Sequence, residues 1–291
     1  MITRNEEYPE LAKALEIKSV YFKREDMHPY GSHKGRSIPV MIDNYIQQGI
    51  KHFAISSSGN AALAAAFYVH KLNETRTDKI KLDILVGQKI TKKKLHKIEP
   101  FKNEYINITM HERPVQTLFN ITKDSGIKSL KQSTDDLALL GYSSLAEELL
   151  EIPNLKVIFV AASSGTTAQA LAEYFESKKK IIIIHVVQTS SCHPIADSFI
   201  DDQQIDEQSI ADAIVDHVAL RKSRLTKLIT DCNGSAWIAS NEQIKAAQDI
   251  TKRCTGLSIS TNSALPIAGL MQAVYTGRSW SGPAVCIICG D

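Results

Sequence analysis

The sequence lacks several features that mark particular classes of protein. Its longest isoleucine run, residues 181–184, has the length of a strand, so we expect no membrane span. The first residues, MITRNEEYPE, contain no basic stretch followed by an apolar one, and we therefore expect no secretion signal. Basic residues number 34 and acidic residues 32, and the formal net charge of +2 predicts neither nucleic acid nor a membrane as a partner.

Cysteine is scarce as well, and its pattern favours no metal or disulfide scaffold. Five cysteines scattered over 291 residues are typical of a reducing compartment, so a cytoplasmic location is expected. Cys286 and Cys289 have the spacing of a redox or metal pair, but residues three apart in a strand point to opposite faces. The pair Cys192-His193 with His185 lacks a second pair of ligands. We therefore expect no metal site.

What the sequence does contain is a regular alternation of strand-sized and helix-sized segments, which predicts an α/β fold with mostly parallel sheets. The expected strands are residues 19–23, 51–55, 80–86, 105–109, 156–161, 181–187 and 284–289. The expected helices are residues 37–48, 60–71, 92–98, 114–125, 143–150, 166–178, 209–225, 240–254 and 263–275. The helix at 240–254 has the clearest ends, because Ser240 and Gln243 form a capping box and Gly256 follows the last turn. Pro266 is expected to interrupt the last helix early.

Two loops of small residues join a strand to a helix. Such loops leave backbone N–H groups unpaired at a helix N-terminus, where a carboxylate or phosphate can bind. A plain serine N-cap before a close-packed alanine helix explains the first loop equally well. The second has neither the Gly-Lys-Ser/Thr ending of a Walker loop nor the Gly-x-Gly-x-x-Gly pattern. The loops are Ser57-Ser58-Gly59-Asn60 and Ala162-Ser163-Ser164-Gly165-Thr166-Thr167.

Lys34 follows a turn and precedes the expected helix at 37–48. A lysine in this position is either a solvated surface charge or an amine nucleophile that reacts with an aldehyde. The residue by itself does not distinguish these two interpretations.

The order of these segments resembles the fold type II pyridoxal-phosphate enzymes, which include threonine synthase, threonine/serine dehydratase, cysteine synthase and the tryptophan synthase β chain. The resemblance depends on Gly31-Ser32-His33-Lys34, the Ser-Ser-Gly-Asn turn, the second loop and a last strand that ends in Cys289-Gly290. Residues 144–146, Ser-Leu-Ala, are similar to a threonine-synthase stretch. The fold implied is two three-layer domains. Residues 40–140 would form the smaller domain, which carries the Ser-Ser-Gly-Asn substrate turn, and residues 1–39 plus 141–291 the larger, which carries the phosphate loop.

The resemblance implies a role for each motif, with pyridoxal 5'-phosphate as the cofactor. Lys34 would form the Schiff base and then carry the α-proton. Ser57, Ser58, Gly59 and Asn60 would hold the substrate carboxylate, with Asn60 also bonded to the phenolic oxygen of the cofactor. The cofactor phosphate would bind Ser163, Ser164, Gly165, Thr166 and Thr167. Cys289 would face the pyridine nitrogen, and His33 would either brace the phosphate or cap its helix.

The implied activity is a lyase or synthase acting on a small amino acid through an external aldimine and α-proton abstraction, of the threonine-synthase type. The alternatives are a serine/threonine dehydratase, or another β-replacement enzyme, and a catalytically weakened cofactor-binding protein. The sequence departs from the family where Ala162 and Ser164 replace glycines, where Ser260-Thr261 replaces Glu-Pro, and where Cys289 replaces a hydroxyl. A homodimer is a possible assembly.

Overall fold

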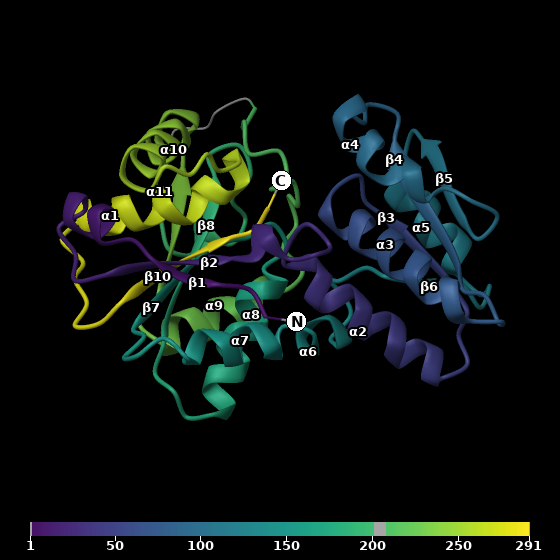
Figure 1. Cartoon of the computed structure of the whole chain (residues 1–291), viewed down its shortest axis with the longest axis horizontal. Coiled ribbons are helices and arrows are strands. Elements are labelled where there is room, and N and C mark those ends of the chain that lie inside the picture. The colour runs from purple at the N-terminus through teal and green to yellow at the C-terminus, as the bar shows by residue number, and fades with distance from the viewer. Residues whose placement is uncertain (1, 201–207, 291) are drawn as a thin grey trace. The chain divides into compact units, whose positions relative to one another are not determined.

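The computed structural model describes residues 2–200 and 208–290, and its chain divides into two compact units. The first unit contains Met1–His28 and Tyr142–Asp291, and the second contains Pro29–Gly141. Each unit has its own sheet and its own helices (Figure 1). Helix α2 (Lys34–Gln47) belongs entirely to the second unit, although the predicted border at residue 40 divides it. The roles expected of the two domains stay predictions.

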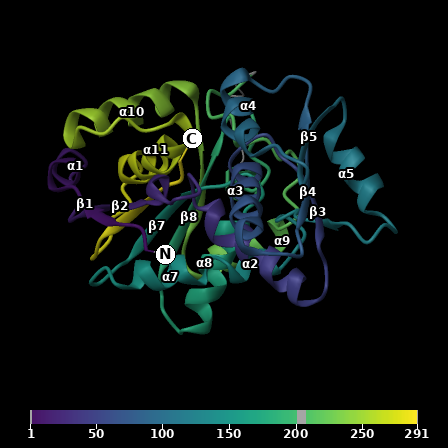
Figure 2. The same cartoon turned by 45° about the vertical axis from the view of Figure 1, so that its right-hand side comes forward.

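The first unit is built on a six-stranded sheet in the order β1-β2-β10-β7-β8-β9. All neighbouring strands are parallel except β1, which pairs antiparallel with β2 at the edge. Helices α1, α10 and α11 cover one face, and α7, α8 and α9 cover the other (Figures 1 and 2). The strands are β1 (Asn5–Glu7), β2 (Val20–Arg24), β7 (Val157–Ala161), β8 (Ile183–Thr189), β9 (Ser235–Ala239) and β10 (Ala284–Ile288). The helices are α1 (Pro9–Ala14), α7 (Ser143–Leu150), α8 (Thr166–Ser177), α9 (Lys222–Asp231), α10 (Asn241–Thr255) and α11 (Thr261–Tyr275), with short 3-10 turns at Glu25–Met27 and Ala196–Ser198.

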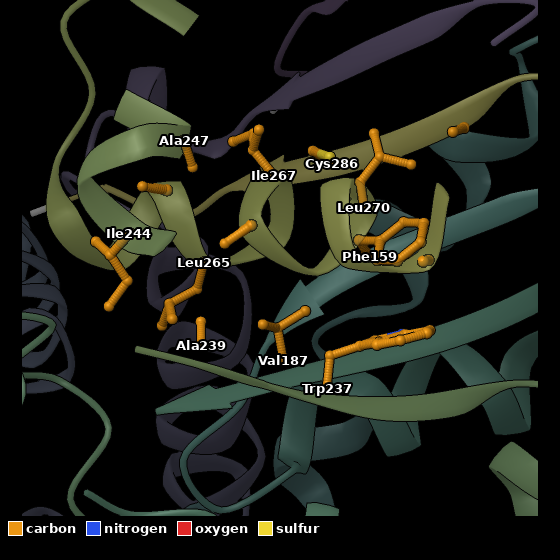
Figure 3. Packing of buried hydrophobic residues seen from close by; sticks show 14 of the residues in the cluster. Phe159, Val187, Trp237, Ala239, Ile244, Ala247, Leu265, Ile267, Leu270 and Cys286 are labelled. Atoms are coloured by element: carbon orange, nitrogen blue, oxygen red, sulfur yellow. The ribbon is translucent and has the colours of Figure 1, made fainter. Parts of the chain in front are cut away.

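Helix α11 forms the centre of the first unit's core, because it is buried along nearly its whole length. Leu265, Ile267 and Leu270 pack toward the strands in Figure 3. A Cβ on Gly269 would lie 2.4 Å from a methyl of Val187, so only glycine lets the helix approach β8 this closely. The helix continues through Pro266, and the predicted interruption is therefore wrong.

The second unit has a parallel four-stranded sheet in the order β5-β4-β3-β6. Helices α3 and α4 lie on one side of it and α5 on the other (Figures 1 and 2). The strands are β3 (His52–Ser56), β4 (Lys81–Gly87), β5 (Ile106–His111) and β6 (Lys128–Ser129). Besides α2, the helices are α3 (Asn60–Thr75), α4 (Lys92–Ile98), α5 (Pro114–Thr122) and α6 (Leu137–Leu140), with a 3-10 turn at Glu99–Phe101.

The predicted α/β class is confirmed, and every expected strand is present within a few residues of its predicted ends. The helix predicted at 209–225 is wrong, because helical structure there begins only at Lys222. The preceding residues bond instead to side chains from distant loops: the Ile210 N–H donates to Asn241 Oδ1 and the Ala213 N–H to Asn262 Oδ1. No helix among the residues described is long and apolar enough to cross a bilayer.

Candidate functional site

The carboxyl ends of the parallel strands in the first unit lie along one edge of its sheet. Ligands of open α/β sheets bind outside this edge. Arg24 ends β2, Thr189 ends β8, and Ser240 and Cys289 follow β9 and β10. Residues 162–167 follow β7, so the structure places the second small-residue loop at the position where a ligand is expected.

This loop turns directly into helix α8. Gly165 is the N-cap residue and has φ +85°, a left-handed conformation that favours glycine. A Cβ at this position would lie 2.5 Å from Leu225 Cδ2 and 3.1 Å from Ile195 Cδ1. Thr166 and Thr167 are buried at the start of the helix, and Ser164 Oγ lies 2.9 Å from Thr166 Oγ1. Hydroxyls and first-turn N–H groups therefore gather at the positive end of the α8 dipole.

Gln188, which the sequence interpretation did not include, fixes the base of this loop. Its Nε2 donates to the Ala162 carbonyl at 3.0 Å and to the Ser163 carbonyl at 3.4 Å. Its Oε1 accepts from the N–H groups of Ile195 and Ala196 at 2.8 and 3.0 Å. The side chain is fully buried, so it ties the loop after β7 to the loop after β8. The available signal was a glutamine near the end of a strand that the apolar run at its start predicts to be buried.

Ser163 is engaged in a way that the sequence did not predict. Its hydroxyl donates to Asp216 Oδ2 at 2.9 Å and accepts from the N–H groups of Val215 and Asp216, both at 3.1 Å. A serine hydroxyl has one proton and two lone pairs, so these three bonds use its whole capacity. The Ser163 side chain therefore holds another segment of the chain in the described structure.

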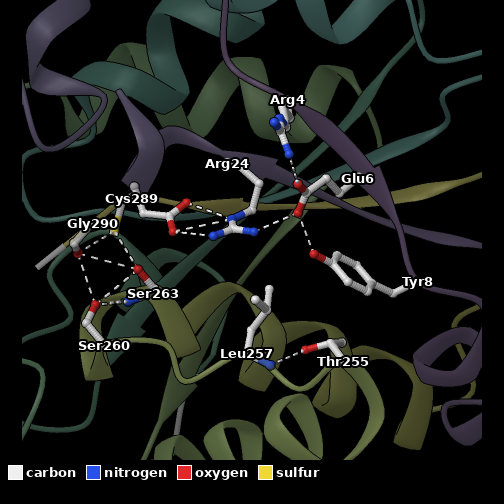
Figure 4. Close-up of polar contacts among 11 residues, drawn as sticks. Arg4, Glu6, Tyr8, Arg24, Thr255, Leu257, Ser260, Ser263, Cys289 and Gly290 are labelled. Atoms are coloured by element: carbon white, nitrogen blue, oxygen red, sulfur yellow. Dashed lines mark hydrogen bonds and ion pairs between the residues drawn. The ribbon is translucent and has the colours of Figure 1, made fainter. Parts of the chain in front are cut away.

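The sulfur of Cys289 lies in a neutral, buried setting beside the start of α11 (Figure 4). Ser263 Oγ is 4.0 Å from Cys289 Sγ and 3.4 Å from the Gly290 carbonyl oxygen. Ser260 Oγ lies 3.0 Å from the same carbonyl and caps α11 by accepting the Ser263 N–H at 3.1 Å. Ser263 thus places one hydroxyl beside the Cys289 sulfur, and Ser260 holds the neighbouring Gly290 carbonyl; the predicted role for Cys289 included neither serine.

Arg24, at the end of β2, is paired with two carboxylates (Figure 4). Its Nη1 donates to Glu6 at 2.6 Å, and its Nε and Nη2 donate to Asp26 at 2.9 and 2.8 Å. The hydrogen bonds to Asp26 and Glu6 raise the pKa of Arg24. Burial and a hydrogen bond to Glu6 raise the pKa of Tyr8 to about 12. The guanidinium of Arg24 is therefore committed to the protein itself.

In the second unit, Lys34 is the first residue of α2 and is half-buried. Its N–H donates to Ser32 Oγ at 3.3 Å. The helix begins three residues earlier than the sequence predicted, so Lys34 belongs to its first turn. His33 occupies the N-cap position without a side-chain capping hydrogen bond, and the capping alternative for this residue is wrong.

The first small-residue loop joins β3 to α3 in the same unit. Ser57 Oγ accepts the Gly59 N–H at 3.3 Å, and the helix begins at Asn60. Gly59 is the N-cap residue and no side chain caps this helix, so the plain serine N-cap is wrong. The alanines on the inner face of α3 are fully buried, as expected for a close-packed helix. The first-turn N–H groups of α3 therefore receive no side-chain cap.

The structure groups the predicted site residues by unit. Residues 163–167 and Cys289 belong to the first unit, whereas Lys34 and residues 57–60 belong to the second. All five cysteines are free. Within residues 2–200 and 208–290, no group of three or more His, Cys, Asp or Glu side chains could hold a metal ion.

Comparison with known proteins gives a match over nearly the whole chain. A family model described as "Pyridoxal-phosphate dependent enzyme" matches residues 2–290. Threonine synthase from Methanosarcina acetivorans is 23% identical over 96% of this chain and 72% of its own length. L-serine dehydratase/L-threonine deaminase from Bos taurus is 27% identical over 60% of this chain, and the match spans about half, 54%, of that protein.

Solved structures with the same fold include two racemases. A pyridoxal 5'-phosphate-dependent aspartate racemase has a TM-score of 0.84 at 19% identity and covers 100% of this chain and 90% of its own. Maize serine racemase has a TM-score of 0.83 at 17% identity, covering 99% of this chain and 87% of its own. At this level of identity the similarity shows the fold alone.

Proposed function

Because the chain belongs to the fold type II pyridoxal-phosphate dependent enzymes, we propose that it is a lyase or synthase acting on a small amino acid. The cofactor of this family is pyridoxal 5'-phosphate. When bound, it supplies an electron sink that eases removal of the substrate's α-proton. The chain's own residues then determine which bond is broken and which molecule is accepted.

The donor groups at the start of α8 fit the phosphate of this cofactor. Ser164, Thr166 and Thr167 offer hydroxyls, and the first turn offers backbone N–H groups at the positive end of the helix dipole. The hydroxyl of Ser163 is already used, so we propose that this residue contributes to phosphate binding only through its backbone. Cys289, with the Ser263 hydroxyl beside its sulfur, would offer a neutral partner to the ring nitrogen.

Lys34 is the residue that we propose moves the proton. Its place in the first turn of α2 restricts its backbone, and half-burial makes its amine less hydrated than a surface lysine. The N-terminal turn of α3, with Ser57, Ser58, Gly59 and Asn60, would bind the substrate carboxylate through unpaired N–H groups and hydroxyls. The carboxylate held by this turn would present the α-carbon to the lysine.

The first candidate reaction is that of a threonine synthase. The observation that supports it is the extent of the similarity, since a threonine synthase matches nearly the whole chain. The proposed reaction begins with removal of the α-proton by Lys34 and then of a β-proton, which lets the phosphate on Cγ leave. Water then adds at Cβ, and protons return to Cγ and Cα to give threonine.

The second candidate is serine/threonine dehydration, and the neutralised Arg24 favours it. A charged guanidinium makes the strongest hydrogen bonds to a substrate phosphate, and that of Arg24 is already paired with Glu6 and Asp26. A substrate whose only anionic group is its carboxylate needs no such charge. Its products would be a keto acid and ammonia.

The test supplies O-phosphohomoserine, threonine and serine separately to the protein loaded with pyridoxal phosphate. Threonine plus phosphate identifies the synthase, keto acid plus ammonia identifies the dehydratase, and D-amino acid identifies a racemase. Bound cofactor without turnover identifies the weakened cofactor-binding protein. Lys34→Ala is expected to remove both the yellow absorbance and the turnover, whereas the exposed control Lys13→Ala is expected to keep both. Unchanged absorbance in Lys34→Ala would refute the role of this lysine.

A further inference from the structure

Residues 208–216, here called the strap, cross the carboxyl-terminal edge of the first unit's sheet without helical or strand structure of their own. Polar side chains from the first turns of α10 and α11 and from the loop before α8 hold the strap. Asn241, after β9, accepts the Ile210 N–H at 2.8 Å. At the start of α11, Thr261 donates to the Ile210 carbonyl at 2.9 Å and Asn262 accepts the Ala213 N–H at 3.0 Å. The strap is therefore a defined part of the fold at this edge.

The last anchor of the strap is the loop proposed to bind the cofactor phosphate. Ser163 Oγ receives the N–H groups of Val215 and Asp216 and gives its own proton to the Asp216 carboxylate. All three bonds lie between 2.9 and 3.1 Å. This contact, here called the latch, places a carboxylate directly on a loop whose other features favour anions.

The carboxylate of Asp216 affects the pKa of the neighbouring Cys192. Burial, with further contributions from the carboxylates of Asp216 and Asp197, raises the pKa of the Cys192 thiol. His193 Nε2 lies 3.3 Å from Asp197 Oδ1, so a protonated imidazole of His193 would form an ion pair with that carboxylate. Asp216, by contrast, has its shortest bond to the neutral hydroxyl of Ser163. Residues 163–167 contain no basic side chain.

We infer that Asp216 is an internal anion that opposes the cofactor phosphate, and that the Ser163 side chain positions the strap instead of binding the phosphate. The inference rests on the proposed function, because it takes residues 163–167 as the phosphate loop. The Asp216 carboxylate and the cofactor phosphate would both lie against the loop at residues 163–167 and repel each other, so the contact of Asp216 with Ser163 weakens phosphate binding. Asp216 thereby sets the affinity of the protein for a phosphorylated cofactor.

The experiment measures binding of pyridoxal phosphate and of pyridoxal, which has the same aldehyde without the phosphate, by absorbance titration of the cofactor-free protein. Asp216→Asn keeps an oxygen that accepts from Ser163 but removes the charge. It is expected to bind pyridoxal phosphate about tenfold more tightly, since one charge near a partly buried anion changes its binding by roughly 1.4 kcal/mol. Pyridoxal binding is expected to stay unchanged. The control Asp231→Asn removes an exposed carboxylate from the end of α9 and is expected to alter neither.

The Ser163→Ala variant tests whether the Ser163 hydroxyl holds the strap or binds the phosphate. If it holds the strap, this variant should show faster hydrogen exchange at Val215 and Asp216 and no selective loss of pyridoxal phosphate binding. A loss of tenfold or more for pyridoxal phosphate, with pyridoxal unaffected, would overturn the inference. An equal response of both aldehydes to Asp216→Asn, or none, would overturn it as well. Failure of both aldehydes to bind wild-type protein would instead refute the proposed function, and unchanged exchange in Ser163→Ala would then independently refute the latch.

Discussion

Gly165→Ala tests whether the turn into α8 needs glycine for its backbone, for its space, or for both. Gly165 has φ +85°, and its missing Cβ would lie 2.5 Å from Leu225 Cδ2 and 3.1 Å from Ile195 Cδ1. Leu225 and Ile195 are fully buried, so their methyl groups have little room to move. Alanine is therefore expected to introduce backbone strain and a steric clash together.

The two effects have separable magnitudes. A left-handed backbone costs alanine about 1 kcal/mol relative to glycine. Forcing a methyl into a packed region costs roughly 1–3 kcal/mol more. Gly256 provides the matched control, because it has φ +75° at the end of α10 and nothing within 4 Å of its missing Cβ. We expect Gly256→Ala to lower the free energy of unfolding by about 1 kcal/mol and Gly165→Ala to lower it by about 2–4 kcal/mol.

Tryptophan fluorescence in a urea titration reports this difference selectively. Trp237 and Trp280, the two tryptophans of the chain, both lie in the first unit with Gly165 and Gly256. Adding Leu225→Ala to the Gly165→Ala variant removes the colliding methyl, so the two changes are expected to couple favourably. Equal destabilisation by the two glycine variants, without coupling to Leu225→Ala, would show that no clash exists.

Two further predictions concern buried titratable groups in the first unit. Burial lowers the pKa of His185 to about 3 from an ordinary value of 6.5, so between these pH values the unfolded chain binds a proton at His185 and the folded chain does not. The contribution of the neutral His185 to stability is present above pH 6.5 and is lost as pH falls toward 3, by about 2 kcal/mol between pH 7 and pH 5. Urea titrations at both pH values should show this loss in wild type but not in His185→Leu. Lys23 and Glu148 form a buried ion pair at 2.5 Å, and Lys23→Met is expected to reduce stability by about 3–5 kcal/mol because it removes the cation bonded to a buried carboxylate. Adding Glu148→Leu should recover much of this loss, and the exposed control Lys227→Met should change stability by about 0–1 kcal/mol; a double variant less stable than Lys23→Met would contradict this reasoning.

Elements with local signals were predictable from the sequence. Strands β7, β8 and β10 are apolar runs that the sheet buries on both faces. Helix α10 has the predicted capping box at Ser240 and Gln243 and ends at Gly256 in the left-handed conformation. Strand β1 was missed because its residues, Asn-Glu-Glu, are polar and pair only at the edge of the sheet.

The false helix at 209–225 shows why other features were not predictable. The N–H groups of this segment donate hydrogen bonds to the side chains of Asn241, Asn262 and Ser163. The bond from the Asp216 N–H to Ser163 Oγ spans 53 positions in the sequence. A local pattern contains no information about such partners. The same reason explains why Gln188, 26 positions from Ala162, was absent from the predicted site.

The composition of the proposed phosphate loop, residues 163–167, makes its affinity for phosphate sensitive to a single nearby charge. A site that binds phosphate through an arginine or lysine has a full positive charge that outweighs one nearby carboxylate. Residues 163–167 offer only hydroxyls, amides and the partial charge of the α8 dipole, equivalent to about half an elementary charge. A single full charge on Asp216, 2.9 Å from Ser163, is therefore comparable with the attraction that the loop itself provides. Each hydroxyl supplies only a small part of that attraction, so removing the Asp216 carboxylate should change phosphate binding more than removing one serine hydroxyl.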